Sequence, residues 1–186
     1  SSIQGETEVK QRWLSEVTKL TMRESASLPV IKCIYERLPY PTRNGGLELA
    51  FMTWAQADSG VLAFCKISET RHDFARLRYV KEDGLPAFYS PDFLVRTETS
   101  IYVVETKAQQ QTTHPNIQRK LKAAAAWCER INGLIPGQRD NHEWRYVLLG
   151  EASFYDWQSK GGRLADLLDF ARVRPIGNIA AQQALI

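Results

Sequence analysis

Two acidic residues and a lysine stand beside two consecutive apolar runs, at a spacing that suits phosphodiester chemistry. Pro91-Asp92 precedes the run "FLVR", and Glu105-Thr106-Lys107 closes the run "SIYVVETK". Paired carboxylates suit a hard cation such as Mg²⁺, with Mn²⁺ as a substitute, and Mg²⁺ takes its other ligands from water and phosphate. An ammonium nearby can hold or deprotonate the attacking water, or stabilise charge that develops on phosphorus. These groups together would allow hydrolysis of a phosphodiester.

The chemistry depends on the register of the hairpin that the two runs are expected to form. With a turn centred on Glu98-Thr99, Asp92 lies directly across from Glu105, and their Cβ atoms are about 4.5–5.5 Å apart. Strand side chains alternate, so Lys107 shares the face of Glu105 whereas Thr106 points away. Carboxylates this close repel unless a cation lies between them, and a one-residue slip would separate them. The alternative is a solvated Glu, Lys and Asp network at a sheet edge.

The elements that must position these residues follow from the hydrophobic pattern. The most apolar run, 100–107, is expected to be a central strand. Alternation of helical and strand-like segments predicts an α/β fold with a mixed sheet flanked by helices. Periodicity predicts helices over 6–24, 47–57, 116–131 and 163–173, strands over 61–67, 73–80, 87–96, 100–107 and 143–150, and a turn over 81–84.

Composition is that of an ordinary globular protein, with 44% hydrophobic and 24% charged residues. The 186 residues suit one domain, divided into an N-terminal helical segment (1–40), a core (41–150) and a C-terminal helix and tail (151–186). A net charge of +3 permits a polyanion partner without requiring one. The three cysteines are distant from one another, which favours reduced thiols in a cytoplasmic protein. No run is apolar enough to predict a membrane span or a signal peptide.

The same strings resemble a known family pattern. Pro91-Asp92 and Glu105-Thr106-Lys107 resemble the "PD" and "ExK" of the PD-(D/E)xK nuclease superfamily. More narrowly, roughly Leu47 to Gly150 resembles the C-terminal endonuclease domain of the restriction subunit of type III restriction enzymes and related helicase–nuclease proteins. The resemblance implies a restriction-endonuclease-like core, with a mixed sheet of about four to five strands, that cuts DNA with Mg²⁺.

By position, the resemblance also implies roles for individual residues. Asp92 and Glu105 match the metal ligands, with the backbone carbonyl of Thr106 as a possible third. Lys107 matches the catalytic lysine, and Glu48 matches the acidic residue on the helix before the sheet. An acid in the first turn of a helix is also favoured by the helix dipole, which is the alternative explanation for Glu48. The family commonly has a glycine after the ETK string, where this chain has alanine.

Contacts to DNA are expected at the start of the helix over 116–131, where backbone N–H groups also favour phosphate. Gln118 stands near the position of a glutamine in some branches, although the usual Q-x-x-x-Y pattern is absent. For each basic candidate the alternative is a solvated surface charge. The candidates are Arg119, Lys120 and Lys122, then Arg43 and Lys66, and of the histidines only His114 is placed to approach the site.

Three readings of the function differ in class. The first is a metal-dependent DNA endonuclease in a type III-like restriction or helicase–nuclease system, or a repair or junction nuclease. The second is a non-catalytic DNA-binding or interaction module on the same fold. A small-molecule hydrolase or nucleotide-binding domain has little support, because no GxxxxGK(S/T) loop is present. We therefore expect any helicase or translocase region and any modification subunit to lie outside these residues. The sequence leaves open whether two copies must meet to cut both strands.

Overall fold

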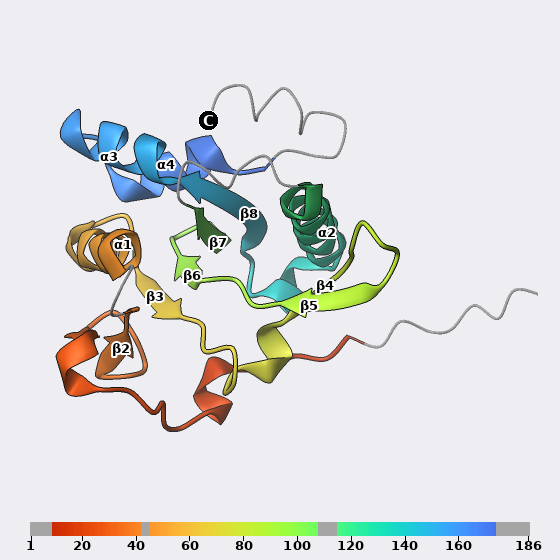
Figure 1. Cartoon of the computed structure of the whole chain (residues 1–186), viewed down its shortest axis with the longest axis horizontal. Coiled ribbons are helices and arrows are strands. Elements are labelled where there is room, and N and C mark those ends of the chain that lie inside the picture. The colour runs from red at the N-terminus through yellow and green to blue at the C-terminus, as the bar shows by residue number, and fades with distance from the viewer. Residues whose placement is uncertain (1–8, 42–44, 108–114, 174–186) are drawn as a thin grey trace, which may run out of the picture.

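A four-stranded mixed sheet forms the centre of the protein (Figure 1). The computed structural model describes residues 9–41, 45–107 and 115–173. In the sheet, β3, β6 and β7 are antiparallel neighbours, and β8 runs parallel to β7. The strands are β3 (Ala63–Lys66), β6 (Phe93–Arg96), β7 (Ser100–Lys107) and β8 (Glu143–Gly150). The predicted α/β fold with a mixed sheet is confirmed, and β7 is a central strand as expected.

Helices cover both faces of this sheet (Figure 1). The first face packs against α1 (Gly45–Ala57), α3 (Glu151–Ser159) and α4 (Leu164–Ala171), and the second packs against α2 (Pro115–Asn132). Alternation divides β7 between them, since Tyr102 and Val104 belong to the first core and Val103 belongs to the second. The helix α3 was not predicted from the sequence.

The hairpin register agrees with the prediction. Phe93 pairs with Val104, and the pairing continues to Arg96 opposite Ile101. At the turn, the Thr97 N–H donates to the Ser100 carbonyl at 2.9 Å. Asp92 therefore comes one position before the last ladder pair, level with Glu105 on the neighbouring strand.

The hairpin of β4 (Leu77–Val80) and β5 (Pro86–Tyr89) forms a separate sheet beside α2. Its turn is the predicted one: the Gly84 N–H donates to the Lys81 carbonyl, and Gly84 has a φ of 83° that favours glycine. The predicted strand over 87–96 is divided into β5 and β6. Pro91 lies at the division, and it has no N–H to donate to a ladder.

The N-terminal region differs from the prediction. Over the described part of the expected helix 6–24 the chain forms 3₁₀ turns, η1 (Leu14–Glu16) and the start of η2 (Glu24–Ala26), and then a hairpin of β1 (Ser27–Pro29) and β2 (Arg37–Pro39). The buried Tyr35 hydroxyl lies 2.7 Å from the Val17 carbonyl oxygen and 3.0 Å from that of Leu14. These tertiary bonds occupy carbonyls that a helix would use, so the helical segment expected over 1–40 is wrong where it is described.

No described helix is long and apolar enough to cross a membrane.

Candidate functional site

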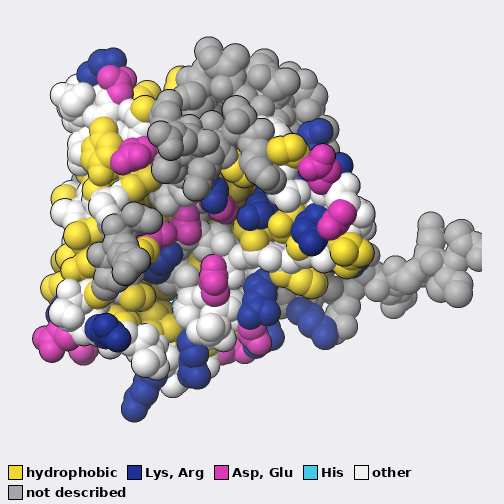
Figure 2. All heavy atoms as spheres, in the orientation of Figure 1, with side chains coloured by type: hydrophobic (Ala, Val, Ile, Leu, Met, Phe, Trp, Pro, Cys, Tyr) yellow, Lys and Arg dark blue, Asp and Glu magenta, His cyan; other side chains and the backbone are white. Residues whose placement is uncertain are grey.

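Five charged side chains meet where β3 and β7 end and β6 begins, near the first turn of α1. Asp92 precedes β6, Glu105 and Lys107 close β7, Lys66 closes β3, and Glu48 lies on α1. All are largely shielded, with side-chain exposures between 8% for Glu105 and 23% for Asp92. On the face shown in Figure 2, acidic and basic side chains lie next to one another near the middle of the molecule.

Asp92 is held by the end of the neighbouring strand. Its N–H donates to the Val104 carbonyl at 3.0 Å, and the next inward-facing N–H of β7, that of Thr106, lies beyond the last ladder pair. Asp92 Oδ2 accepts from this N–H at 2.8 Å and from the Thr106 hydroxyl at 2.9 Å. The prediction that Thr106 points away from Asp92 is therefore wrong, because β6 begins only at Phe93 and the Asp92 carboxylate turns to satisfy the N–H that β6 leaves unpaired.

An ammonium links the two acids on the α1 side of this site. Lys66 Nζ lies 3.0 Å from Glu48 Oε1 and 3.8 Å from Asp92 Oδ1, and 5.4 Å from the centre of the Phe93 ring. Glu48 Oε2 is buried and has no hydrogen-bond partner among the described residues. Burial raises the pKa of the Glu48 carboxyl, Lys66 opposes that shift, and the charge of Asp92 adds to it.

A second ion pair lies on the α2 side. Lys107 Nζ is 3.1 Å from Glu105 Oε1, so the prediction that these side chains share a face is confirmed. Glu105 Oε2 is buried without a hydrogen-bond partner in the part of the chain that is described. Burial raises the pKa of Glu105, the charge of Asp92 raises it further, and Lys107 lowers it. Burial also raises the pKa of the neighbouring Tyr89 and Tyr146 hydroxyls, and the Glu105 charge adds to both shifts.

The three acids therefore divide between two ammonium groups: Glu48 and Asp92 share Lys66, and Glu105 pairs with Lys107. Glu105 follows the alternation of Val103, which packs on the α2 side, whereas the Asp92 carboxylate turns toward Thr106 and Lys66. Within the described ranges, no group of three or more His, Cys, Asp or Glu side chains is arranged to hold a metal ion. The donor chemistry does fit a hard divalent cation, because the unpartnered atoms are carboxylate oxygens.

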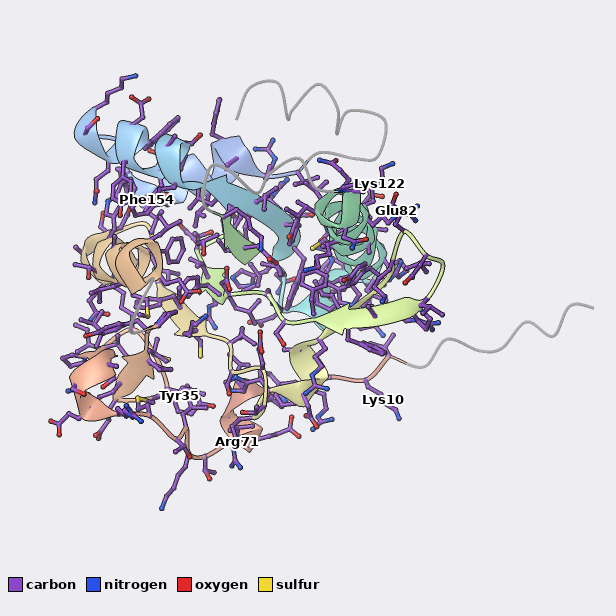
Figure 3. The ribbon with its side chains drawn as sticks, viewed as in Figure 1. Lys10, Tyr35, Arg71, Glu82, Lys122 and Phe154 are labelled. Atoms are coloured by element: carbon purple, nitrogen blue, oxygen red, sulfur yellow. The ribbon has the colours of Figure 1, made fainter. Side chains whose placement is uncertain are left out.

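The expected DNA-binding residues on α2 have different surroundings. Arg119 and Lys122 are exposed, and Figure 3 labels Lys122 on α2. Lys120 is half-buried, with its Nζ 5.5 Å and 5.2 Å from the ring centres of Tyr79 and Tyr89. Lys120 is thus a positioned cation rather than a freely moving surface charge.

The remaining candidates for DNA contact also have different surroundings. Gln118 is half-buried on α2, while Arg43 and His114 lie outside the described residues. Lys66 is not the surface cation that was expected, because it pairs with Glu48 and Asp92. Its place at the end of an apolar strand, like that of Lys107, is a sequence signal that would have indicated this role.

The comparisons with known proteins bear on the same region. Residues 65–133 match the family described as TnsA-like endonuclease N terminal. The matched segment runs from the end of β3 through α2, so it includes Asp92, Glu105 and Lys107 but not Glu48, and it is less than half of the 186 residues. Neither a curated protein nor a solved structure matches the chain significantly. The match supports an endonuclease of the PD-(D/E)xK type in this segment, without favouring the type III restriction family.

Proposed function

We propose that this chain is a metal-dependent DNA endonuclease domain that hydrolyses phosphodiester bonds where β6 begins and β7 ends. The observation that carries the proposal is the pair of buried carboxylate oxygens, Glu48 Oε2 and Glu105 Oε2, that have no hydrogen-bond partner among the described residues. A buried polar atom without a hydrogen-bond partner is costly, and the lysine beside each acid pairs with the other oxygen, Oε1. Asp92, Glu105 and Lys107 lie within the segment that matches an endonuclease family.

Each residue of the site has a role in this proposal. Asp92 and Glu105 hold the divalent cation, and Glu48 and the Thr106 carbonyl are further candidate ligands. When bound, Mg²⁺ would polarise the phosphate and lower the pKa of a coordinated water. The Thr106 N–H and hydroxyl fix Asp92 Oδ2, which limits the orientations that the Asp92 carboxylate can adopt.

Lys107 is the residue that we assign to the reacting phosphate. Its ammonium is held 3.1 Å from Glu105 Oε1 while 21% of the side chain remains exposed, so part of Lys107 can contact a DNA backbone. A fixed ammonium stabilises the negative charge that develops on the phosphate oxygens in the transition state. It can equally hold the attacking water beside the acids.

The biological setting is a narrower proposal. The strings around Pro91-Asp92 and Glu105-Thr106-Lys107 favour a type III-like restriction or helicase–nuclease system, in which a motor and a modification subunit would lie elsewhere. The family match favours a TnsA-like endonuclease instead. A repair or junction nuclease would use the same site, and a non-catalytic DNA-binding module is the alternative from another class.

Nicking of supercoiled plasmid by the purified chain tests the proposal. We expect nicking in Mg²⁺ or Mn²⁺ that EDTA abolishes and that Lys107→Met slows by roughly 100-fold or more. Lys160→Met is the matched control, because Lys160 also pairs with a carboxylate, Asp156 at 2.9 Å, but is 73% exposed directly after α3. Nicking that persists in a Glu105→Gln/Lys107→Met double variant would overturn the proposal. DNA binding without metal and without cleavage would favour the non-catalytic module.

A further inference from the structure

We propose that Lys66 is an internal counter-ion of Glu48 and Asp92 that competes with the divalent cation for these two acids. The inference rests on the proposed metal-dependent function, and it assigns to Lys66 the control of metal affinity. Its basis is the geometry of one ammonium between two shielded carboxylates, 3.0 Å from Glu48 Oε1 and 3.8 Å from Asp92 Oδ1.

The oxygens of Asp92 show why the competition is direct. Oδ2 already accepts two hydrogen bonds from Thr106, at 2.8 Å and 2.9 Å, so its position is fixed by the strand end. Oδ1 is the oxygen left to face a cation, and it faces Lys66. A divalent ion that binds Asp92 through Oδ1 must therefore lie close to the Lys66 ammonium. Two neighbouring cations repel strongly where water is largely excluded.

Glu48 leads to the same conclusion from the opposite side. Lys66 occupies Oε1, whereas the buried Oε2 is unsatisfied within the described part of the structure. One ammonium thus compensates two acids incompletely, which leaves the pair attractive to a more highly charged ion. Because a divalent ion can satisfy oxygens on both acids, its binding would release Lys66 from them.

Lys66 has space into which it can move. Lys66 also lines an open pocket together with Leu20, Thr21, Ile67, Ser68 and Glu69. A long, flexible lysine can rotate from the two acids into this pocket without disturbing β3, and Glu69 offers another carboxylate there. The released ammonium would then lie beside the metal site, where it could meet a DNA phosphate.

Calorimetric titration of the full chain with Mn²⁺ measures the affinity for the metal ion, so it tests the competition by Lys66 without any activity measurement. We expect Lys66→Met to bind Mn²⁺ roughly tenfold more tightly than the wild type, because the competing charge is removed while the aliphatic stem is kept. Lys66→Arg, which retains a charge, should not tighten binding. Lys160→Met should behave as the wild type does. Unchanged or weaker Mn²⁺ binding by Lys66→Met would overturn the inference.

Two further measurements separate this inference from the proposed function. If Asp92→Asn loses Mn²⁺ binding while Lys66→Met leaves it unchanged, the metal site stands and the competition is refuted. If neither the wild type nor Lys66→Met binds Mn²⁺, both ideas fail. Should Lys66→Met fold poorly without metal, its melting temperature must rise more in Mn²⁺ than that of the wild type; an equal or smaller rise refutes the competition.

Discussion

The charge balance at the site differs between the α1 side and the α2 side. On the α1 side, Glu48 and Asp92 share one ammonium, that of Lys66. On the α2 side, Glu105 has its own partner in Lys107, and the charge of Lys120 also acts to lower the pKa of Glu105. Negative charge is therefore in excess on the α1 side and positive charge on the α2 side. This difference suits a cation near Asp92 and a DNA phosphate near Lys107.

The packing that supports the two sides differs as well. On the α1 side, Phe154 of α3 is fully buried, with its ring centre 5.2 Å from that of Trp54 and 6.4 Å from that of Phe51 (Figure 3). On the α2 side a smaller core joins α2 to β8 and to the β4–β5 hairpin. The position of Glu48 therefore depends on the larger core, while the surroundings of Glu105 depend on the smaller one.

Truncation of Phe154 tests the role of the larger core and is expected to cause the largest loss of stability. We expect Phe154→Ala to lower the free energy of unfolding by about 3–5 kcal/mol, because a buried aromatic is lost and a cavity remains. Urea denaturation measures the change. Phe170→Ala is the matched control: Phe170 on α4 is 50% exposed, and its loss should cost about 1 kcal/mol or less. Equal losses in both variants would contradict the view that Phe154 ties α3 to α1.

Substitution of Asp92 separates its structural role from its proposed catalytic role. Asp92→Ala leaves the Thr106 N–H and hydroxyl without their acceptor, so we expect a loss of about 1–3 kcal/mol in stability. Asp92→Asn keeps an acceptor oxygen and should lose less, while both variants should lose cleavage. If the two variants were equally stable, the hydrogen bonds to Thr106 would not support the strand end.

The central hairpin and its register could be predicted from the sequence because local rules determine them. Alternation along 100–107 and a turn that closes Thr97 against Ser100 leave one register that buries the apolar side chains, and the structure has that register. The same reasoning placed Lys107 on the face of Glu105. These are consequences of strand geometry alone.

The predictions that failed depended on tertiary contacts. The helix expected over 6–24 had helical spacing, but the Tyr35 hydroxyl bonds the carbonyls of Leu14 and Val17 instead. Thr106 turned out to contact Asp92 because β7 continues beyond the first residue of β6, and strand boundaries are poorly specified by sequence. Likewise, the link from Lys66 to Glu48 joins residues that are distant in the chain.

The pH dependence of stability tests the burial of Glu105. Its pKa is raised above 4.5, so the folded state binds this proton more tightly than the unfolded state does. The stability that Glu105 contributes is therefore present below pH 4.5 and is lost as the pH rises through the raised pKa. Glu105→Gln cannot ionise, so it should gain stability relative to the wild type as the pH rises, with a slope of at most about 1.4 kcal/mol per pH unit.

Urea denaturation between pH 4 and pH 7 measures this difference, and Glu16→Gln supplies a comparison of opposite sign. The Trp13 N–H donates to Glu16 Oε2 at 2.6 Å and lowers the pKa of Glu16. Its stabilising contribution is present above the unfolded pKa and is lost as the pH falls, so Glu16→Gln should lose stability relative to the wild type as the pH rises. The same pH trend in both variants would contradict the assignment of Glu105 as a destabilising buried charge.

Substitution of Lys120 is expected to have the smallest effect, and it tests whether DNA binds on the α2 side. Its Nζ is held over the rings of Tyr79 and Tyr89, and the Tyr89 hydroxyl donates to its backbone carbonyl at 3.2 Å. A cation fixed beside Glu105 can bind a phosphate with little loss of side-chain entropy.

Lys120→Met should therefore reduce DNA affinity several-fold and lower the slope of log affinity against log salt by about 1. Fluorescence anisotropy in increasing salt measures both quantities, with Lys160→Met as the control. A slope equal to that of the wild type would mean that Lys120 makes no phosphate contact, and the excess of positive charge on the α2 side would then serve only to compensate Glu105.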